Sequence, residues 1–176
     1  IFVTRTLARV LWMLAGWIEL ILLGLPLYLF SLLPGERGDG YRRLFRSWCR
    51  AFVHALGVDL RLHQKNRKPL PRHYLLVANH PSAFEDVGIP ALFDVDSLAK
   101  IEVRSWWLVG RISAAAGTLF VQRESSSSRS QVVEQIVARL RAGRNVALYP
   151  EGGVKGKRLH DKFYHGVFEI SLRTGI

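Results

Sequence analysis

Residues 74–86 read Tyr-Leu-Leu-Val-Ala-Asn-His-Pro-Ser-Ala-Phe-Glu-Asp, an apolar run joined to a helix start through a histidine. Residues 74–78 have the length and composition of a buried strand. Pro81 biases His80 away from helical angles and itself suits the first position of a helix. We therefore predict that His80 lies at a strand-to-helix corner, where its side chain can face a cleft.

The two carboxylates that follow make His80 a candidate general base. Glu85 and Asp86 fall in the first turn and a half of the predicted helix, whose positive dipole end favours acidic side chains and a neutral imidazole. The neutral ring is the form that a base needs. The pattern also has a purely structural explanation, in which His80 closes a helix end and the acids only suit the dipole, so other motifs have to decide.

Two further short strands end in a charged residue. Residues 117–123 read Gly-Thr-Leu-Phe-Val-Gln-Arg, and residues 146–153 read Val-Ala-Leu-Tyr-Pro-Glu-Gly-Gly. Open α/β sheets bind ligands beyond the carboxyl ends of their strands. We therefore expect Arg123 and Glu151 to lie just past strand ends on the same side of a sheet as His80.

The order and spacing of these three segments resemble the glycerolipid acyltransferase family, whose best-known members acylate 1-acylglycerol 3-phosphate. Its first three motif blocks are His-x4-Asp, Gly-x-x-Phe-[Ile/Val]-x-Arg and Phe-Pro-Glu-Gly-Thr-Arg, and the resemblance runs from about residue 41 to the end of the chain. It implies a membrane-bound enzyme that moves a fatty acyl group from acyl-CoA or acyl carrier protein to the free hydroxyl of a lysophospholipid. The thioester is a co-substrate, and no cofactor or metal is implied.

The chain departs from the family's first block at one position. After four intervening residues, Glu85 stands where the family has Asp, and Asp86 follows it directly. Either carboxylate could orient the ring of His80.

The third block departs from the pattern at three positions. Tyr149 replaces Phe, Gly153 replaces Thr and Val154 replaces Arg, so one basic group expected near the substrate headgroup is absent from its usual place. The basic residues that follow at once could substitute for it; they are Lys155, Lys157 and Arg158.

The resemblance assigns roles to individual residues. His80, oriented by Glu85 or Asp86, would take the proton of a lysolipid hydroxyl that attacks the thioester carbonyl, and backbone N–H groups after His80 could stabilise the oxyanion. The sequence has no Gly-x-Ser-x-Gly elbow, so we expect direct transfer without an acyl-enzyme. Arg123 suits a bidentate contact with a lipid phosphate. The full set of predicted substrate-binding residues is Asn79, Lys100, Gly117, Arg123, Glu151, Gly152 and Lys155.

Composition limits the class of protein. The chain has 176 residues, of which 49% are apolar, so a packed core is expected. Cys49 is the single cysteine, which excludes an internal disulfide, and we expect it to be a small buried side chain. The formal net charge of +11 points to an anionic partner, such as nucleic acid, anionic lipid or a phosphorylated or CoA-like substrate.

The first 40 residues read as a hydrophobic membrane anchor with a linker. Residues 10–33 carry one charge, Glu19, and as a helix would reach about 36 Å, enough for a bilayer core of roughly 30 Å. Gly16, Gly24 and Pro26 leave two arrangements open, a kinked span or a re-entrant or interfacial pair of segments. A buried core helix of a soluble domain is the remaining alternative.

Residues 41–176 read as an α/β domain that begins with a basic amphipathic helix. Its apolar residues recur at helical spacing from Tyr41, its arginines occupy the other side, and Gly57 ends it. After a membrane segment such a helix is expected to lie on an anionic leaflet, and its arginines place the domain in the cytoplasm by the positive-inside rule. An ordinary helix packed on the domain with a solvated arginine face is the alternative, and both could be true.

The remaining chain alternates strand and helix patterns. We predict strands over residues 58–62 and 97–100, and helices over residues 104–116 and 130–141, with Ser128 and Gln131 at capping-box spacing. Residues 125–128 are expected to form a surface loop. The fold class is therefore α/β, with a mixed or mostly parallel sheet flanked by helices. Because the chain starts without Met and stops before the family's fourth block, we expect it to be a fragment truncated at its carboxyl end.

The alternatives to an enzyme are weaker. Residues 152–158 are one residue short of a phosphate-binding P-loop, and the histidines lack the paired spacing of a zinc site. Nucleic-acid binding is not favoured, because the basic residues accompany a membrane segment and no recognised DNA or RNA module is present. The main competitor is a non-catalytic module that binds anionic lipid and keeps a degenerate acyltransferase site.

Overall fold

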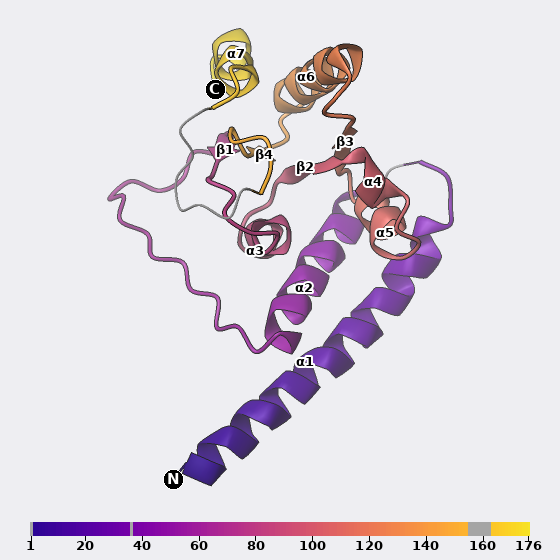
Figure 1. The fold of residues 1–176 in the computed structure, drawn as a ribbon, viewed down its shortest axis with the longest axis vertical. Helices are drawn as coiled ribbons and strands as arrows, with labels where there is room; N and C mark the ends of the chain where they lie inside the picture. Colours follow the sequence, from indigo (N-terminus) through magenta and orange to yellow (C-terminus); the bar gives the residue numbers. More distant parts are fainter. Residues whose placement is uncertain (1, 36, 155–162) are drawn as a thin grey trace.

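The computed structural model describes residues 2–35, 37–154 and 163–176 (Figure 1). A pair of helices precedes an alternation of strands and helices. The helices are α1 Phe2–Ser31, α2 Asp39–Ala55, α3 Glu85–Leu92, α4 Ile101–Arg104, α5 Val109–Ala115, α6 Ser126–Arg141 and α7 Gly166–Thr174. The strands are β1 Leu75–Val77, β2 Asp96–Lys100, β3 Leu119–Val121 and β4 Val146–Leu148.

The four strands form one parallel sheet in the order β1-β4-β2-β3. The three residues of the inner strand β4 are all buried, as expected for a strand covered on both faces. β1 is an edge strand whose Val77 is half exposed, so the predicted buried strand is shorter and more exposed than its composition suggested. The predicted α/β class with a mostly parallel sheet is confirmed.

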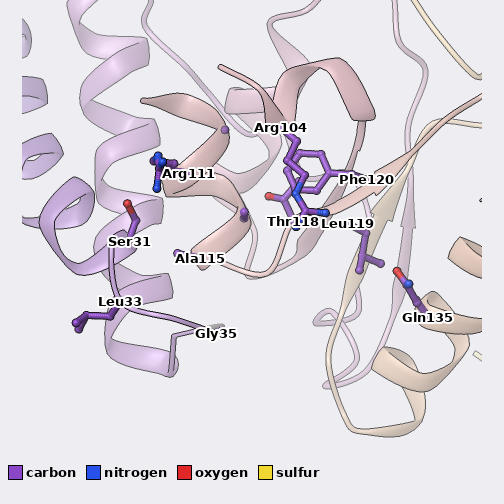
Figure 2. A pocket seen from close by; sticks show the side chains of 12 residues that line it. Ser31, Leu33, Gly35, Arg104, Arg111, Ala115, Thr118, Leu119, Phe120 and Gln135 are labelled. Carbon is purple, nitrogen blue, oxygen red and sulfur yellow. The ribbon is translucent and has the colours of Figure 1, made fainter. Parts of the chain in front are cut away.

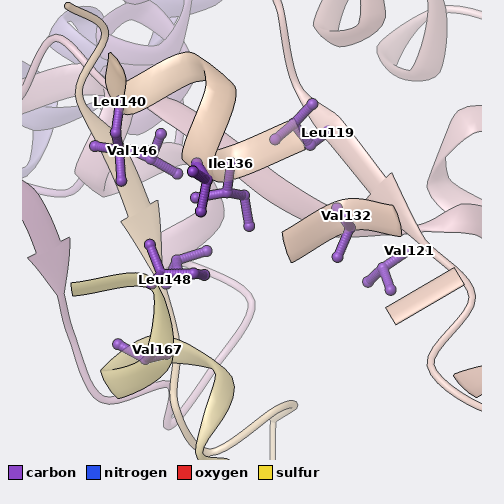
Figure 3. Packing of buried hydrophobic residues seen from close by; sticks show 10 residues of the cluster. Leu119, Val121, Val132, Ile136, Leu140, Val146, Leu148 and Val167 are labelled. Atoms are coloured by element: carbon purple, nitrogen blue, oxygen red, sulfur yellow. The ribbon is translucent and has the colours of Figure 1, made fainter. Parts of the chain in front are cut away.

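Helices α6 and α7 cover one face of the sheet (Figures 1 and 3). Their apolar side chains pack on those of β3 and β4 to form a core. The buried members of this core are Leu119, Val121, Val132, Ile136, Val137, Leu140, Val146, Leu148, Val167 and Ile170.

A second core lies on the opposite side, among α1, α2, α3 and α5. Leu27, Trp48, Cys49 and Ile112 are among its most buried side chains. Burial raises the pKa of the Cys49 thiol to about 12, so this cysteine stays protonated at neutral pH. The prediction of a buried, unpaired cysteine is confirmed.

From about Trp12 onward, α1 packs along α2 as an antiparallel pair (Figure 1). A Cβ on Gly16 would lie 2.5 Å from the backbone nitrogen of Ala55, so only glycine allows the two backbones to approach this closely. Trp48 donates its indole N–H to the carbonyl of Leu20. α1 is one unbroken helix with Pro26 inside it, so the re-entrant pair of segments that the sequence left open is not formed.

α2 ends as predicted, because Gly57 adopts φ 70° and the N–H of Val58 bonds to the carbonyl of Val53. Two of its arginines do not face outward. Arg50 donates to the carbonyl of Ala91, and Arg46 donates to that of Leu92 at the carboxyl end of α3. α2 therefore packs on the domain, between α1 and α3, as the alternative had it, but these two arginines do not belong to a solvated face.

Three local predictions were wrong. Residues 58–62 form no strand, and among the described residues no strand pairs with the outer edge of β1 or of β3. The helix predicted over residues 104–116 is broken into α4 and α5, because Gly110 packs against the backbone of Arg104. α6 begins at Ser126, and its cap is Ser125, whose hydroxyl accepts from the N–H of Ser128.

Candidate active site

The parallel sheet brings three predicted residues past the same edge. His80 follows β1, Glu151 follows β4 and Arg123 follows β3, and all three strands run in one direction. The carboxyl ends of the strands therefore deliver a ring, a carboxylate and a guanidinium to one side of the molecule.

His80 is held by Glu85. The ring nitrogen Nδ1 of His80 lies 3.2 Å from Oε2 of Glu85, and the His80 side chain is only 4% exposed. A carboxylate accepts a hydrogen bond, so this contact places the proton of a neutral imidazole on Nδ1 and leaves Nε2 as a proton acceptor. That is the tautomer that a general base requires.

Ser82 fixes Glu85 in this position. The backbone N–H of Ser82 donates to Oε2 of Glu85 at 3.0 Å, and the Ser82 hydroxyl donates to Oε1 at 3.0 Å. The Ser82 hydroxyl also accepts the N–H of Phe84 at 3.1 Å. Ser82 and Glu85 thus bond each other across the turn that precedes α3, and the same glutamate also bonds the histidine ring. The N–H groups of Ser82 and Phe84 are thereby occupied within the turn, which removes two of the donors expected to face an oxyanion.

Asp86 lies on the other side of the ring. Its Oδ1 is 3.9 Å from Nε2 of His80, which is too long for a hydrogen bond, and its side chain is 49% exposed. Partial burial raises the pKa of Asp86, the positive form of His80 and the Arg123 guanidinium lower it, and the Glu85 charge raises it further. Of the two candidate partners, Glu85 is therefore the one that makes the hydrogen bond.

Tyr149 packs flat on His80. The two ring centroids are 4.1 Å apart, and the planes are inclined by 12°. Burial raises the pKa of the Tyr149 phenol, and the carboxylates of Asp86 and Glu85 add to this, so the phenol stays neutral. Its hydroxyl is buried and has no hydrogen-bond partner among the described residues.

Glu151 is almost fully buried, with 1% of its surface exposed. Its Oε1 has no hydrogen-bond partner within the described part of the chain. Gly152 follows with φ 68°, and a Cβ at this position would lie 2.4 Å from the ring of Tyr164. The tight turn expected after Pro150 is thus present, and glycine suits it on both counts.

The side chain of Arg123 lies against Gly153, in the segment that follows β4. A Cβ on Gly153 would come within 2.7 Å of Nη1 of Arg123, so the guanidinium occupies space that a larger residue would need. Arg123 also lies close enough to Asp86 to lower its pKa. Gly153 therefore lies in direct contact with the tip of this arginine.

The other predicted substrate-binding residues are placed less centrally. Asn79 is exposed beside His80. Lys100 ends β2, and its Nζ lies 3.7 Å from Oε1 of Glu102. Gly117 lies at the opposite edge of the sheet, where its φ is 100° and a Cβ would meet the Asp96 carboxylate at 3.2 Å. Lys155, with its neighbours Lys157 and Arg158, lies outside the described residues.

Two roles escaped the sequence analysis. The Ser82-x-x-Glu85 spacing is a visible capping-box signal that would have favoured Glu85 over Asp86. The stacking of Tyr149 on His80 has no local signal, because the two residues come from different strands. Among the described residues, no group of three side chains is arranged to hold a metal ion. A groove of about 510 Å³ lies away from His80, beside the end of α1 (Figure 2).

Several known proteins are similar to this chain in sequence. The Acyltransferase family model matches residues 59–176. The lyso-ornithine lipid O-acyltransferase of Pseudomonas aeruginosa is 33% identical over 168 residues, which cover 92% of this chain and 63% of that protein. The enzyme of the same name from Rhizobium meliloti is 36% identical over 68% of this chain and 41% of its own length.

A second kind of relative is also found. The 1-acyl-sn-glycerol-3-phosphate acyltransferase of Neisseria meningitidis is 31% identical over 72% of this chain and 49% of its own length. No solved structure matches the chain. The chain belongs to the acyltransferase family, and it spans about 41–63% of the length of these three relatives.

Proposed function

We propose that this chain carries the catalytic centre of a membrane-bound O-acyltransferase that acts on a lysolipid. The observation that carries the proposal is the hydrogen bond between His80 and Glu85, which leaves Nε2 of His80 unprotonated at the sheet edge where Arg123 and Glu151 also lie. The relatives named above, which act on lyso-ornithine lipid or on 1-acylglycerol 3-phosphate, support this class of reaction.

The reaction follows from the position of the ring. Nε2 of His80 takes the proton of the acceptor hydroxyl as its oxygen attacks the carbonyl carbon of the thioester. The tetrahedral intermediate then expels the thiolate of CoA or acyl carrier protein, which takes the proton back from His80. The Glu85 carboxylate stabilises the imidazolium that exists between these steps, and such general-base assistance contributes about 10² to 10⁴ in rate.

The acceptor has an anionic headgroup in this proposal. Arg123 offers a planar fork of donors that fits a phosphate or a carboxylate bidentately. A phosphate fits 1-acylglycerol 3-phosphate, the acceptor that the sequence pattern favours. A carboxylate fits an ornithine headgroup, and the lyso-ornithine lipid relatives make this the second candidate.

The membrane attachment is assigned to α1. Residues Thr4–Ser31 are long and apolar enough to cross a bilayer, and most of their surface is exposed. The arginines of α2 that follow α1 favour the cytoplasmic side, whose leaflet is anionic, whether α1 crosses the bilayer or lies on it.

The experiment that tests the function uses the full-length protein in membranes, with labelled acyl-CoA and acyl carrier protein thioesters and a panel of lysolipids that includes both candidate acceptors. Acyl transfer to one of them that falls by 10² or more in His80→Ala would support the proposal. His63→Ala, a change in an exposed loop, serves as the matched control and is expected to keep full activity. If wild type and His80→Ala are equally inert while both bind anionic vesicles, the chain is a lipid-binding module instead of an enzyme.

A further inference from the structure

Two tryptophans are exposed in the turn between α4 and α5. Trp106 is 57% exposed and Trp107 is 71% exposed, although tryptophan is among the residues with the largest mean burial. The ring of Trp107 lies edge-on to that of Tyr28, with centroids 5.5 Å apart, so the turn is adjacent to the last part of α1.

Gly110 allows α4 and α5 to approach closely on either side of this turn. A Cβ on Gly110 would lie 2.4 Å from the carbonyl oxygen of Arg104, so the start of α5 contacts the end of α4 directly. The N–H of Gly110 bonds to the carbonyl of Trp106 at 2.8 Å, which fixes the shape of the turn. The two indole rings are therefore exposed on a turn whose ends are held together by these contacts.

Two arginines flank the pair of tryptophans. Arg104 and Arg111 have no carboxylate partner among the described residues, and both line the groove of about 510 Å³. Figure 2 shows this groove between α5, β3 and the end of α1, with Arg111 next to Ser31 and Arg104 next to Phe120. Unneutralised guanidinium groups beside apolar side chains suit the headgroup of an anionic amphiphile.

The adjoining helix carries an apolar stripe over most of its length. The exposed large residues of this stripe recur every three or four positions, at Leu7, Leu11, Leu14, Ile18, Ile21, Leu25 and Leu29. Charged residues of α1 point to the other side, because Arg9 donates to the carbonyl of Gly57 and Glu19 lies 3.2 Å from His54. A helix with one long apolar face and its charges opposite can lie along a membrane surface.

We propose that residues 104–111 form a second membrane contact, in which Trp106 and Trp107 enter the interface and Arg104 and Arg111 bind anionic headgroups. Tryptophan and arginine prefer this level of the bilayer, where the ring is apolar on its face and polar at its N–H. The occupant is the anionic leaflet, because the tryptophans continue the apolar surface of α1 and the arginines match its charge. This inference rests on the proposed attachment of α1 to a membrane.

The test places a nitroxide spin label in the turn without removing either tryptophan. The label is attached at Ser105→Cys in the full-length protein, with other reactive cysteines replaced, and reconstituted in vesicles that contain phosphatidylglycerol. We expect the label to be reached by oxygen and protected from a water-soluble nickel chelate. In the Trp106→Ser/Trp107→Ser background the preference reverses, while a label at Arg129→Cys on α6 stays in water in both backgrounds.

A second comparison tests whether Arg104 and Arg111 bind anionic headgroups. In vesicles of phosphatidylcholine alone, the label at residue 105 should move toward water, and Arg104→Gln/Arg111→Gln should abolish this dependence on anionic lipid. Charge-matched changes at Arg129 and Arg141 on α6, which lies beyond the sheet from α1, should leave the dependence intact (Figure 1).

The outcomes distinguish the membrane contact of the turn from the membrane attachment of α1. A label at Ile18→Cys in lipid, with the label at residue 105 in water, would show that α1 binds the membrane and that the turn does not. Both labels in water would refute the membrane attachment itself. A label at residue 105 protected from both reagents would show that protein covers the turn, either a second copy or a partner, and would overturn the inference.

Discussion

The ring of Tyr149 lies flat on the ring of His80, with centroids 4.1 Å apart, at the position where the motif pattern that this sequence resembles has phenylalanine. The stack fixes the plane of the imidazole, and the hydrogen bond from Nδ1 to Glu85 fixes its rotation. The phenol hydroxyl contributes nothing to either contact, because it is buried without a partner among the described residues.

Tyr149→Phe should therefore keep acyl transfer within about twofold of wild type and stabilise the protein by about 1 kcal/mol, since an unsatisfied buried polar group is removed. Tyr149→Ala should lower the rate by tenfold or more and destabilise the fold, because the ring of His80 loses its support. Urea unfolding and initial rates measure the two effects. A large loss of activity in Tyr149→Phe would show that the hydroxyl takes part in the reaction.

Glu85→Gln should lower kcat by about 10² or more, because the amide can accept the Nδ1 proton but cannot stabilise the imidazolium by charge. Asp86→Asn should lower kcat less than tenfold, since Asp86 makes no hydrogen bond to the ring. Initial rates at saturating substrate compare the two variants. Equal losses in both would show that the two carboxylates act as a unit.

Arg123→Lys should raise KM for an anionic lysolipid by about tenfold with little change in kcat, because a single ammonium replaces a bidentate fork. Arg67→Lys, an exposed change in the loop before β1, is the control. Kinetics with charged and uncharged lysolipids provide the measurement, and an effect of equal size on both would assign Arg123 to the structure of the site instead of to the headgroup.

The partial burial of Asp86 predicts a pH effect on stability. Its pKa is raised in the folded protein, so the folded state holds this proton more tightly than the unfolded state does. Between the unfolded and the folded pKa, the free energy of unfolding therefore falls as pH rises, and the cost is fully present above the folded pKa. Asp86→Asn should be more stable than wild type at neutral pH, with a gain that disappears below the unfolded pKa. Denaturant unfolding at several pH values tests this, and a gain independent of pH would contradict it.

Asp96 is predicted to be the carboxylate on which folding depends most. Its side chain is 1% exposed and paired with Arg144 and with Arg139. Asp96→Ala should cost about 3–5 kcal/mol, because two guanidinium groups lose their buried counter-charge. The exposed Asp94→Ala should cost at most about 1 kcal/mol. Equal costs in urea unfolding would show that the buried cluster has no special weight.

The sequence predicted those parts of the fold that depend on local pattern. The apolar runs before His80 and Tyr149 located two strands, and Gly57 located the end of α2, because burial and backbone conformation limit the residues allowed there. The strand expected over residues 58–62 failed for the opposite reason, since alternation makes a strand possible but only a neighbouring strand makes it form. At the break between α4 and α5, Gly110 contacts Arg104 of α4. The periodicity of apolar residues in the sequence carries no information about such a contact.

The site was predictable to a similar extent. The motifs placed His80, Arg123 and Glu151 past strand ends, and the choice between Glu85 and Asp86 was left open because it depends on the side to which the ring faces. Gly117 was expected near the substrate from its motif alone, and the structure places it at the far edge of the sheet beside Asp96. A glycine suits this position because φ is 100° and because a Cβ would lie 3.2 Å from the Asp96 carboxylate.

The turn at residues 82–85, which leads into α3, links catalysis to local opening of the backbone. The same Glu85 oxygen accepts the Ser82 amide and the His80 ring, so each transient opening of this turn also releases the base. Hydrogen exchange at the Ser82 amide therefore reports the fraction of molecules whose histidine is correctly oriented. A substitution that speeds this exchange should lower the rate of acyl transfer in proportion, even when it lies on α3 far from any bound lipid.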